Sequence, residues 1–372
     1  MIKSSNLRKI SIIDLVSHYK SIKDEINSVV LEVLSSGHYI LGENVEAFEE
    51  ELARYLGCKY VVACANGTDA ITLALKSLGI EPNNEVITVS HSFFATSEAI
   101  ALAGAKPVFA DIHEKDFNIN PQKIEQLITP RAKAIVPVHI YGQPCEIQSV
   151  IDIANKYNLY VIEDCAQAAG AKFNGKCVGT FGDVGTFSFF PTKNLGAFGD
   201  AGAICTNNEN VADKFKQLRV HGSPKRHVHD YVGTNSRLDE IQAAILRVGL
   251  KYLDKWNFDR QKAAKNYDEL LADVKEIQLP FVKPNVHHVF HQYTIKTEKR
   301  DLLLQKLKES GIEATIYYPV PIHLQKAFNY LNYRNESLPV TEKVCKEILS
   351  LPLYPEITPD IQEYIVDCIK RT

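Results

Sequence analysis

Short apolar runs alternate with helix-periodic segments through the first half of the chain. Aliphatic and aromatic residues predominate over 60–63, 86–89, 133–138 and 159–162, and each run predicts a buried strand. Between these runs, apolar residues recur at helical spacing over 69–78, 95–103 and 147–157. A regular order of strand, helix and strand is typical of crossover connections. The pattern therefore predicts an α/β fold with a mostly parallel central sheet and helices on both faces.

A different pattern begins near residue 237. Leu238, Ile241, Ile245 and Val248 repeat at helical spacing, and we expect this helix to continue toward residue 271. Beyond it, the pattern predicts a strand over 291–296 and helices over 301–310 and 341–349. The change predicts two domains, a large domain over residues 1–250 and a smaller C-terminal α+β domain over residues 251–372.

Length, charge and cysteine usage narrow the class of protein. The 372 residues provide room for two domains with a sizeable core. The 42 Lys and Arg against 45 Asp and Glu give a net charge of −3, which argues against broad binding to nucleic acid or an anionic membrane. No apolar run approaches the ~20 residues of a membrane helix, and Met1–Asn6 do not begin a signal peptide. Eight cysteines without a Cys-x-x-Cys pair predict reduced thiols, no metal site and a cytoplasmic protein.

A candidate phosphate site lies between the strand over 60–63 and the next helix. Asn66, Gly67, Thr68 and Asp69 stand where the helix begins. A helix N-terminus presents free backbone N–H groups to an anion, Gly67 permits close approach, and Thr68 adds a hydroxyl donor. An ordinary turn with a helix cap explains the same residues and stays open as the alternative.

Two carboxylates end the strand over 159–162. Glu163 and Asp164 follow this strand, and Gln167 lies three residues further on. Ligands of α/β proteins bind at the carboxyl ends of parallel strands, so Asp164 is a candidate ligand-binding carboxylate. A helix cap is the alternative for Asp164.

Lys193 lies among aromatic residues, Pro and Gly rather than among other charges. A partly desolvated lysine loses its proton and attacks carbonyl groups, although a surface loop is the usual place for lysine. Ser188 offers a hydroxyl to an anion, and Phe93 offers an aromatic ring or fills a core. A phosphate site, a carboxylate, a nucleophilic lysine and a ring together predict a pyridoxal 5′-phosphate (PLP) site.

The sequence resembles the DegT/DnrJ/EryC1/StrS family of sugar aminotransferases over essentially its whole length. Members of this family are fold-type I PLP-dependent enzymes. The resemblance is carried by motifs in a specific order: Gly37–Gly42 with Phe48 and Glu49, Asn66–Ala70, Ser92–Thr96, Glu163–Gln167, Phe187–Gly196, Gly199–Gly202, Gly233–Leu238 and Tyr318–Gln325.

The resemblance implies roles for the cofactor-binding residues. It implies that Lys193 binds PLP covalently, that Asp164 pairs with the pyridine nitrogen and that Gln167 approaches the ring hydroxyl. It assigns the phosphate to Gly67, Thr68 and Ser188. Phe93 stays the candidate for the ring over the cofactor face, on the chemical grounds given above.

The resemblance also implies a homodimer with active sites at the subunit interface. Asn235 would reach the phosphate of the neighbouring subunit's cofactor; a polar helix cap is the alternative. The residues expected to bind substrate are Phe190, Tyr317, Tyr318 and His323 for the hexose, and Lys225 and Arg226 for a nucleotide diphosphate. A solvated loop is the alternative for the segment with Lys225 and Arg226.

Some members of the family have His in place of this lysine and are dehydrases, so Lys193 implies transamination. The sequence that follows Lys193 resembles the corresponding segment of family members that aminate C3. The expected reaction transfers an amino group from L-glutamate to a dTDP-linked 3-keto-6-deoxyhexose, giving a dTDP-3-amino-3,6-dideoxyhexose for a surface polysaccharide or a glycosylated product. A UDP-2-acetamido-3-keto uronic acid, a 4-keto nucleotide sugar and a non-catalytic sugar-nucleotide-binding regulator remain as alternatives.

Overall fold

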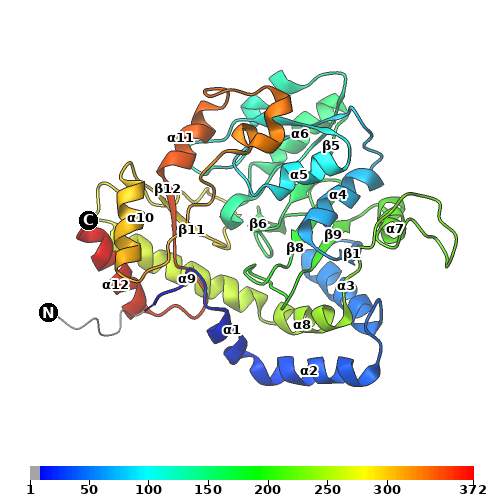
Figure 1. Ribbon diagram of the computed structural model, residues 1–372, viewed down its shortest axis with the longest axis horizontal. Helices are drawn as coiled ribbons and strands as arrows, with labels where there is room; N and C mark the ends of the chain where they lie inside the picture. Colours follow the sequence, from blue (N-terminus) through cyan, green and yellow to red (C-terminus); the bar gives the residue numbers. More distant parts are fainter. Residues whose placement is uncertain (1–8) are drawn as a thin grey trace.

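A seven-stranded sheet forms the centre of the larger part of the molecule (Figure 1). The computed structural model describes residues 9–372, so Met1–Asn6, from which the absence of a signal peptide is predicted, lie outside the described residues. In spatial order the strands are β1 (Tyr60–Cys64), β9 (Gly202–Thr206), β8 (Val184–Ser188), β5 (Tyr160–Asp164), β4 (Ala132–Ile135), β2 (Glu85–Val89) and β3 (Lys106–Ala110). Only β9 runs antiparallel to its neighbours, which confirms the mostly parallel sheet.

Helices cover both faces of this sheet, as predicted. Alternate residues of a strand point to opposite faces, so Val61 and Ala63 pack in one core and Val62 in another. One face carries α3 (Glu43–Leu56), α6 (Ile147–Tyr157) and α8 (Glu240–Leu250). The other carries α4 (Gly67–Ser77), α5 (Ala95–Leu102) and α7 (Glu209–Leu218).

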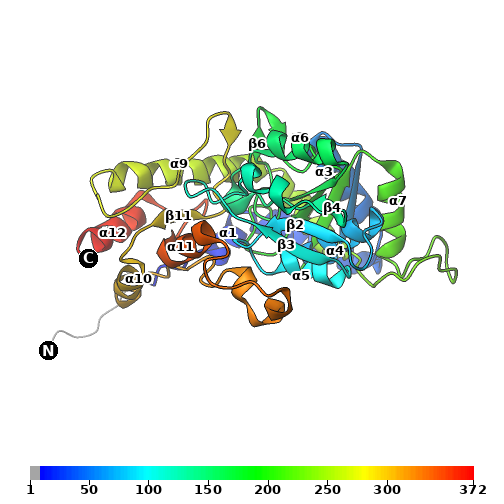
Figure 2. The ribbon, with the colours of Figure 1, turned by 90° about the horizontal axis from the view of Figure 1, so that it is seen from above.

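The C-terminal elements form a separate apolar core beside the sheet (Figure 2). An antiparallel pair, β11 (Tyr293–Lys296) and β12 (Ile348–Leu351), packs with α9 (Leu253–Leu271), α10 (Arg300–Glu309) and α12 (Pro359–Lys370). The proposed domain boundary at residue 250 coincides with the end of α8.

The remaining elements are short or peripheral: α1 (Leu15–Ser21), α2 (Lys23–Ser36), α11 (Pro339–Glu347), β6 (Lys172–Phe173), β7 (Lys176–Cys177), β10 (Val286–His287), η1 (Pro121–Lys123), η2 (Glu125–Leu127), η3 (Ile140–Gly142), η4 (Ile322–Leu324) and η5 (Lys326–Leu331). Across residues 9–372, no helix has the length and apolar character required to cross a membrane. All eight cysteines are free thiols, as predicted.

Two helix predictions in the second half of the chain are wrong in detail. The helix expected from residue 237 toward 271 is two helices, α8 and α9, which part at Lys251 and Tyr252. Gly249 lies just before this break, packed against Leu195 and Trp256. The helix expected over 341–349 ends at Glu347, because the fully buried residues that follow pair with β11 as strand β12.

Candidate active site

A cavity of about 440 Å³ opens at the carboxyl ends of the parallel strands. Strands β5 and β8 end at its wall, the loops after β1 and β2 form more of the wall, and residues of the C-terminal region complete it. It brings together the following residues predicted from the sequence: Gly67, Thr68, Phe93, Asp164, Gln167, Ser188, Phe190, Lys193, Tyr317 and Tyr318.

Asp164 presents a fixed carboxylate at the end of β5. Thr96 donates its hydroxyl to Oδ2 at 2.8 Å, and the backbone N–H of Ala166 donates to Oδ1 at 3.0 Å. Ser92 Oγ lies 2.9 Å from Thr96 Oγ1 and holds that hydroxyl in turn. Asp164 is 4 % exposed, so these bonds aim one buried carboxylate into the cavity.

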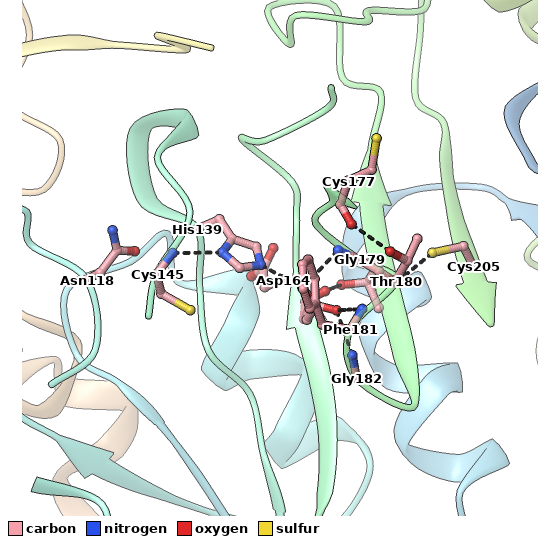
Figure 3. Close-up of polar contacts among 12 residues, drawn as sticks. Asn118, His139, Cys145, Asp164, Cys177, Gly179, Thr180, Phe181, Gly182 and Cys205 are labelled. Carbon is pink, nitrogen blue, oxygen red and sulfur yellow. Dashed lines mark hydrogen bonds and ion pairs between the residues drawn. The ribbon is translucent and has the colours of Figure 1, made fainter. Parts of the chain in front are cut away.

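Glu163, the preceding residue, lies on the opposite face of the strand and has a structural role. Its carboxylate accepts backbone N–H groups of Gly179, Phe181 and Gly182 at 2.8–2.9 Å and contacts His139 Nε2 at 3.1 Å (Figure 3). Burial raises the pKa of Glu163, but the hydrogen bonds from His139 and these N–H groups outweigh burial and hold it below its usual value. The pair Glu163–Asp164 therefore supplies one carboxylate to the fold and one to the cavity.

His139, Glu163 and Cys165 lie close enough to share a metal ion, with their ligand atoms within 4.8 Å of one another. The ligand atoms of His139 and Glu163 have protein partners, however. His139 Nδ1 accepts the backbone N–H of Cys145 at 3.1 Å, which leaves Nε2–H to donate to Glu163. We therefore assign this cluster to the packing behind β5.

Lys193 reaches the cavity from the loop between β8 and β9. Burial lowers the pKa of Lys193 to about 8, against the opposing effect of the Asp164 charge. The next residue fixes this loop: Asn194 donates to the carbonyl of Val289 at 2.9 Å and to Asn257 Oδ1 at 2.7 Å. A lysine in this setting has an appreciable fraction of neutral, nucleophilic amine near neutral pH.

The N-terminus of α4 forms a narrow cup beside Lys193. Gly67 and Thr68 are the first residues of this helix, so their backbone N–H groups have no acceptor within it. A Cβ on Gly67 would stand 2.7 Å from Ser188 Cβ, so only glycine lets the helix end lie this close to β8. The Ser188 hydroxyl and the free N–H groups thus surround a site suited to a phosphate.

Aromatic residues line the more open part of the cavity. Phe93 is 58 % exposed, which excludes the core-packing alternative within this chain, and its ring lies 6.0 Å from that of Tyr318. Gln167 donates to Tyr318 Oη at 3.1 Å and accepts the backbone N–H of Tyr141 at 2.6 Å. Phe190 and Tyr317 complete this aromatic wall.

Sequence reasoning missed three residues that build the site. Thr96 holds Asp164, and its place in the Ser92–Thr96 motif was the available signal. Asn194 anchors the loop of Lys193, and His291 lines the cavity and lies 3.1 Å from Asn194. His291 could not be found from local sequence, because it comes to the cavity from the start of the C-terminal region.

Four of the predicted substrate- or partner-site residues lie away from this cavity. His323 is 2 % exposed, and its ring nitrogens contact Ser90 at 2.7 Å and Glu342 at 3.2 Å, so its imidazole is engaged in the fold and is not in the cavity wall. Lys225 and Arg226 are exposed on the long loop between α7 and α8, which extends outward in Figure 1, and Asn235 is exposed at the base of this loop, where it pairs with Val220.

Comparison with known proteins gives a consistent result. The model of the DegT/DnrJ/EryC1/StrS aminotransferase family matches residues 20–370. A "pleiotropic regulatory protein" of Geobacillus stearothermophilus is 48% identical, with 97% of each chain covered. A UDP-N-acetyl-3-dehydro-α-D-glucosamine 3-aminotransferase of Acidithiobacillus ferrooxidans is 44% identical, with 98% of each chain covered.

Two further proteins extend the comparison. A dTDP-3-amino-3,6-dideoxy-α-D-galactopyranose transaminase of Aneurinibacillus thermoaerophilus is 43% identical over 93% of this chain and 95% of its own. The crystal structure of S. venezuelae DesV in complex with a ketimine intermediate matches with a TM-score of 0.95 at 39% identity, covering 98% of both chains.

The family depends on PLP, and the residues of the cavity fit this cofactor. The Asp164 carboxylate suits a protonated pyridine nitrogen, the Lys193 amine suits the aldehyde, and the cup at Gly67 suits the phosphate. The fold, the site and the family model agree: this chain belongs to the DegT/DnrJ/EryC1/StrS family and is a PLP-dependent sugar aminotransferase.

Proposed function

We propose that this enzyme transfers the amino group of L-glutamate to C3 of a dTDP-linked 3-keto-6-deoxyhexose, giving a dTDP-3-amino-3,6-dideoxyhexose. The choice of C3 is supported by the names of two relatives, a 3-aminotransferase and a 3-amino-sugar transaminase, at 44% and 43% identity. The second of these names a dTDP-linked 3,6-dideoxyhexose.

One observation carries the choice of a deoxyhexose over a uronic acid. Phe190, Tyr317 and Tyr318 line the cavity, and among its described lining residues Lys193 is the sole Lys or Arg. A uronate carboxylate removed from water needs a cationic partner, whereas the C6 methyl of a deoxyhexose packs against aromatic rings. The lining therefore favours an uncharged hexose.

Each proposed role follows from the position of a side chain. PLP supplies an electron sink for the carbanion that forms when the donor Cα loses its proton. Asp164, fixed by Thr96 and Ala166, holds the proton on the pyridine nitrogen. Burial lowers the pKa of Lys193 to about 8, so its neutral amine can accept the proton of the donor Cα. Lys193 would then deliver this proton to C4′ of the bound cofactor.

We also propose that the active enzyme is a homodimer with shared sites. On α2, Leu31 is 62% exposed and Leu34 is 48% exposed; Phe198, in the same β8–β9 loop as Lys193, is 42% exposed. Large apolar side chains in such numbers favour a protein–protein contact. Asn235 is exposed and does not line the cavity of its own subunit, so it is available to serve the partner's cofactor phosphate.

The substrate proposal is tested by comparing acceptors on one enzyme preparation. The PLP-loaded protein is supplied with L-glutamate and, separately, with a dTDP-3-keto-6-deoxyhexose or a UDP-2-acetamido-3-keto uronic acid. We expect kcat/KM to be at least about tenfold higher for the dTDP sugar, the ratio that ~1.4 kcal/mol provides. Equal or reversed values would overturn the choice of sugar. An absorbance spectrum that L-glutamate leaves unchanged would instead favour a non-catalytic regulator.

A pair of variants connects this result to the cavity. Phe190→Ala removes a ring from the cavity wall, while Phe258→Ala removes an exposed ring of α9 that lies outside the cavity. We expect Phe190→Ala to lower kcat/KM for the sugar about tenfold and Phe258→Ala to change it less than twofold. Equal effects of the two variants would contradict the placement of the hexose.

A further inference from the structure

A directed chain of hydrogen bonds lies behind the aromatic wall and ends on the backbone of Tyr317. Tyr141, in the 3-10 turn η3, is 4 % exposed, and its Oη contacts the Tyr317 carbonyl oxygen. The same Oη lies 2.9 Å from His91 Nε2. The other ring nitrogen, His91 Nδ1, lies 3.6 Å from Cys345 Sγ in α11. His91 and Cys345 are also buried.

The chemistry of these groups fixes the direction of each bond. A carbonyl only accepts, so the single Tyr141 hydroxyl proton is donated to Tyr317. Tyr141 Oη must then accept from His91, which places the ring proton on Nε2. Burial lowers the pKa of His91 to about 4, so the ring is neutral and Nδ1 is free to accept from the Cys345 thiol.

Tyr141 also holds the second aromatic residue of the wall, through its backbone. Its N–H donates to Gln167 Oε1 at 2.6 Å, and Gln167 Nε2 donates to Tyr318 Oη at 3.1 Å. Tyr141 has φ +57°, a left-handed conformation that bulky residues rarely adopt. In this conformation, the Tyr141 hydroxyl contacts Tyr317, and the Tyr141 N–H contacts Gln167, which in turn holds Tyr318.

The segment that carries Tyr317 and Tyr318 is otherwise anchored at its two ends. Thr315 exchanges backbone hydrogen bonds with Ser350 of β12, at 3.1 and 2.8 Å. At the other end, the Ile322 N–H donates to the Ser90 carbonyl at 3.0 Å. Tyr317 and Tyr318 lie between these anchors, where the contacts made by Tyr141 and Gln167 fasten them to the sheet.

We propose that Tyr141 is a positioning residue for the acceptor end of the cavity: its hydroxyl fixes Tyr317, and its backbone fixes Tyr318 through Gln167. The proposal rests on the assignment of Tyr317 and Tyr318 to the hexose. It implies that the Tyr141 hydroxyl affects the reaction with the sugar and leaves the reaction with the amino donor unaffected, because Gln167 keeps its backbone donor in a Tyr141→Phe variant.

The test compares Tyr141→Phe with a matched variant, Tyr267→Phe. Tyr267 is also fully buried and also donates its hydroxyl to a backbone carbonyl, that of Pro352 at 3.0 Å, but it lies in the C-terminal core. Both holoenzymes are examined by amide hydrogen exchange of residues 316–320, by absorbance changes with L-glutamate alone, and by kcat/KM for the dTDP-3-keto sugar. The exchange measurement requires no sugar.

We expect Tyr141→Phe to speed exchange of residues 316–320 about fivefold and to lower kcat/KM for the sugar by a similar factor, with the L-glutamate reaction within twofold of wild type. Tyr267→Phe should change none of the three beyond twofold. Unchanged exchange in Tyr141→Phe, or equal losses in the sugar and L-glutamate reactions, would overturn the proposal. A wild-type enzyme that rejects the sugar would count against the proposed function, and the exchange result would still decide the role of Tyr141.

If Tyr141→Phe does not fold, His91→Asn replaces it. This variant removes the Nε2–H donor to Tyr141 while keeping an amide near the position of Nδ1. Faster exchange of residues 316–320 than in Tyr267→Phe supports the proposal, and exchange equal to that in Tyr267→Phe overturns it.

Discussion

Lys193 owes its reactivity to its place on the cavity wall. Burial lowers its pKa to about 8, whereas the charge of Asp164 acts in the opposite direction. At pH 8 about half of such amines are neutral, compared with under ~1% for an ordinary lysine of pKa ~10.4. The same side chain in a solvated loop would be protonated and inert at this pH.

This pKa predicts selective modification of the cofactor-free protein. An amine-acylating reagent should label Lys193 ahead of an exposed lysine such as Lys156, with a labelling midpoint near pH 8. Asp164→Asn removes the charge that raises the pKa of Lys193, so the midpoint should move to lower pH. Peptide mass spectrometry across a pH series measures both values, and a midpoint that stays in place or rises in Asp164→Asn would refute this electrostatic account.

Replacement of the lysine tests its role in turnover. Lys193→Ala removes both the cofactor anchor and the group that moves the proton, so we expect kcat to fall by at least about a thousandfold. Lys156→Ala, a change on the exposed face of α6, should retain wild-type activity. Steady-state assays with L-glutamate decide the point, and near-normal turnover in Lys193→Ala would eliminate the assignment.

At the residue scale, a sequence pattern locates a side chain best where one local element fixes its position. Asp164 ends a strand, Gly67 begins a helix and Lys193 lies in a short loop, and the structure brings all three to one cavity. His323 shows the limit. Its burial depends on Ser90 and Glu342, which are distant from it in sequence, and no local pattern encodes these contacts.

At the scale of the element, the N-terminus of α4 depends on close approach to β8. Gly67 lies against Ser188, and Gly202 of β9 packs against the Asn66 carbonyl on the other side. Two glycines on different elements thus allow three backbones to meet at the proposed phosphate site. This arrangement explains why a helix end beside β8 forms a narrow cup.

Gly67→Ala tests this arrangement. The new Cβ would stand 2.7 Å from Ser188 Cβ, so α4 or β8 must shift. We expect PLP affinity to fall by about tenfold or more, whereas Ser77→Ala, at the other end of the same helix, should leave it within twofold. Equilibrium dialysis or fluorescence titration with PLP provides the values, and equal affinities in wild type and Gly67→Ala would argue against the phosphate cup.

Element prediction worked best for the alternating first half of the chain. The strands and helices around β1, β2, β4 and β5 lie close to their predicted positions because apolar periodicity is strong there. Beyond residue 237, one helix is predicted where the structure has two, α8 and α9. The helical spacing of apolar residues continues through Lys251 and Tyr252, so local hydrophobicity does not reveal the break between the two helices. Strand β12 was missed because its pairing with β11 joins residues more than fifty positions apart.

On the scale of the whole molecule, the cavity depends on both regions of the chain. Lys193 and Asp164 come from the sheet region, while His291 and Tyr317 come from beyond residue 250. The proposed dimer would add Asn235 from a second chain. A complete site would therefore require three contributions that are far apart in sequence.

A subunit-complementation experiment tests the shared sites. In a heterodimer of Lys193→Ala and Asn235→Ala chains, one site carries both changes and the other carries neither. If Asn235 serves the partner's cofactor, the co-expressed and doubly purified heterodimer should regain about half of wild-type turnover per dimer, although the Lys193→Ala homodimer is inactive and the Asn235→Ala homodimer retains PLP poorly. Activity no higher than the average of the two homodimers would place Asn235 in its own subunit's site or outside the chemistry.

The regiochemistry of transfer tests the central claim most directly. The PLP-loaded enzyme is given isotopically labelled L-glutamate and then, separately, dTDP-3-keto- and dTDP-4-keto-6-deoxyhexoses, and NMR locates the label in each product. Our account predicts labelled nitrogen at C3 of the 3-keto sugar and none on the 4-keto sugar. Label at C4, or label on neither sugar, would contradict it.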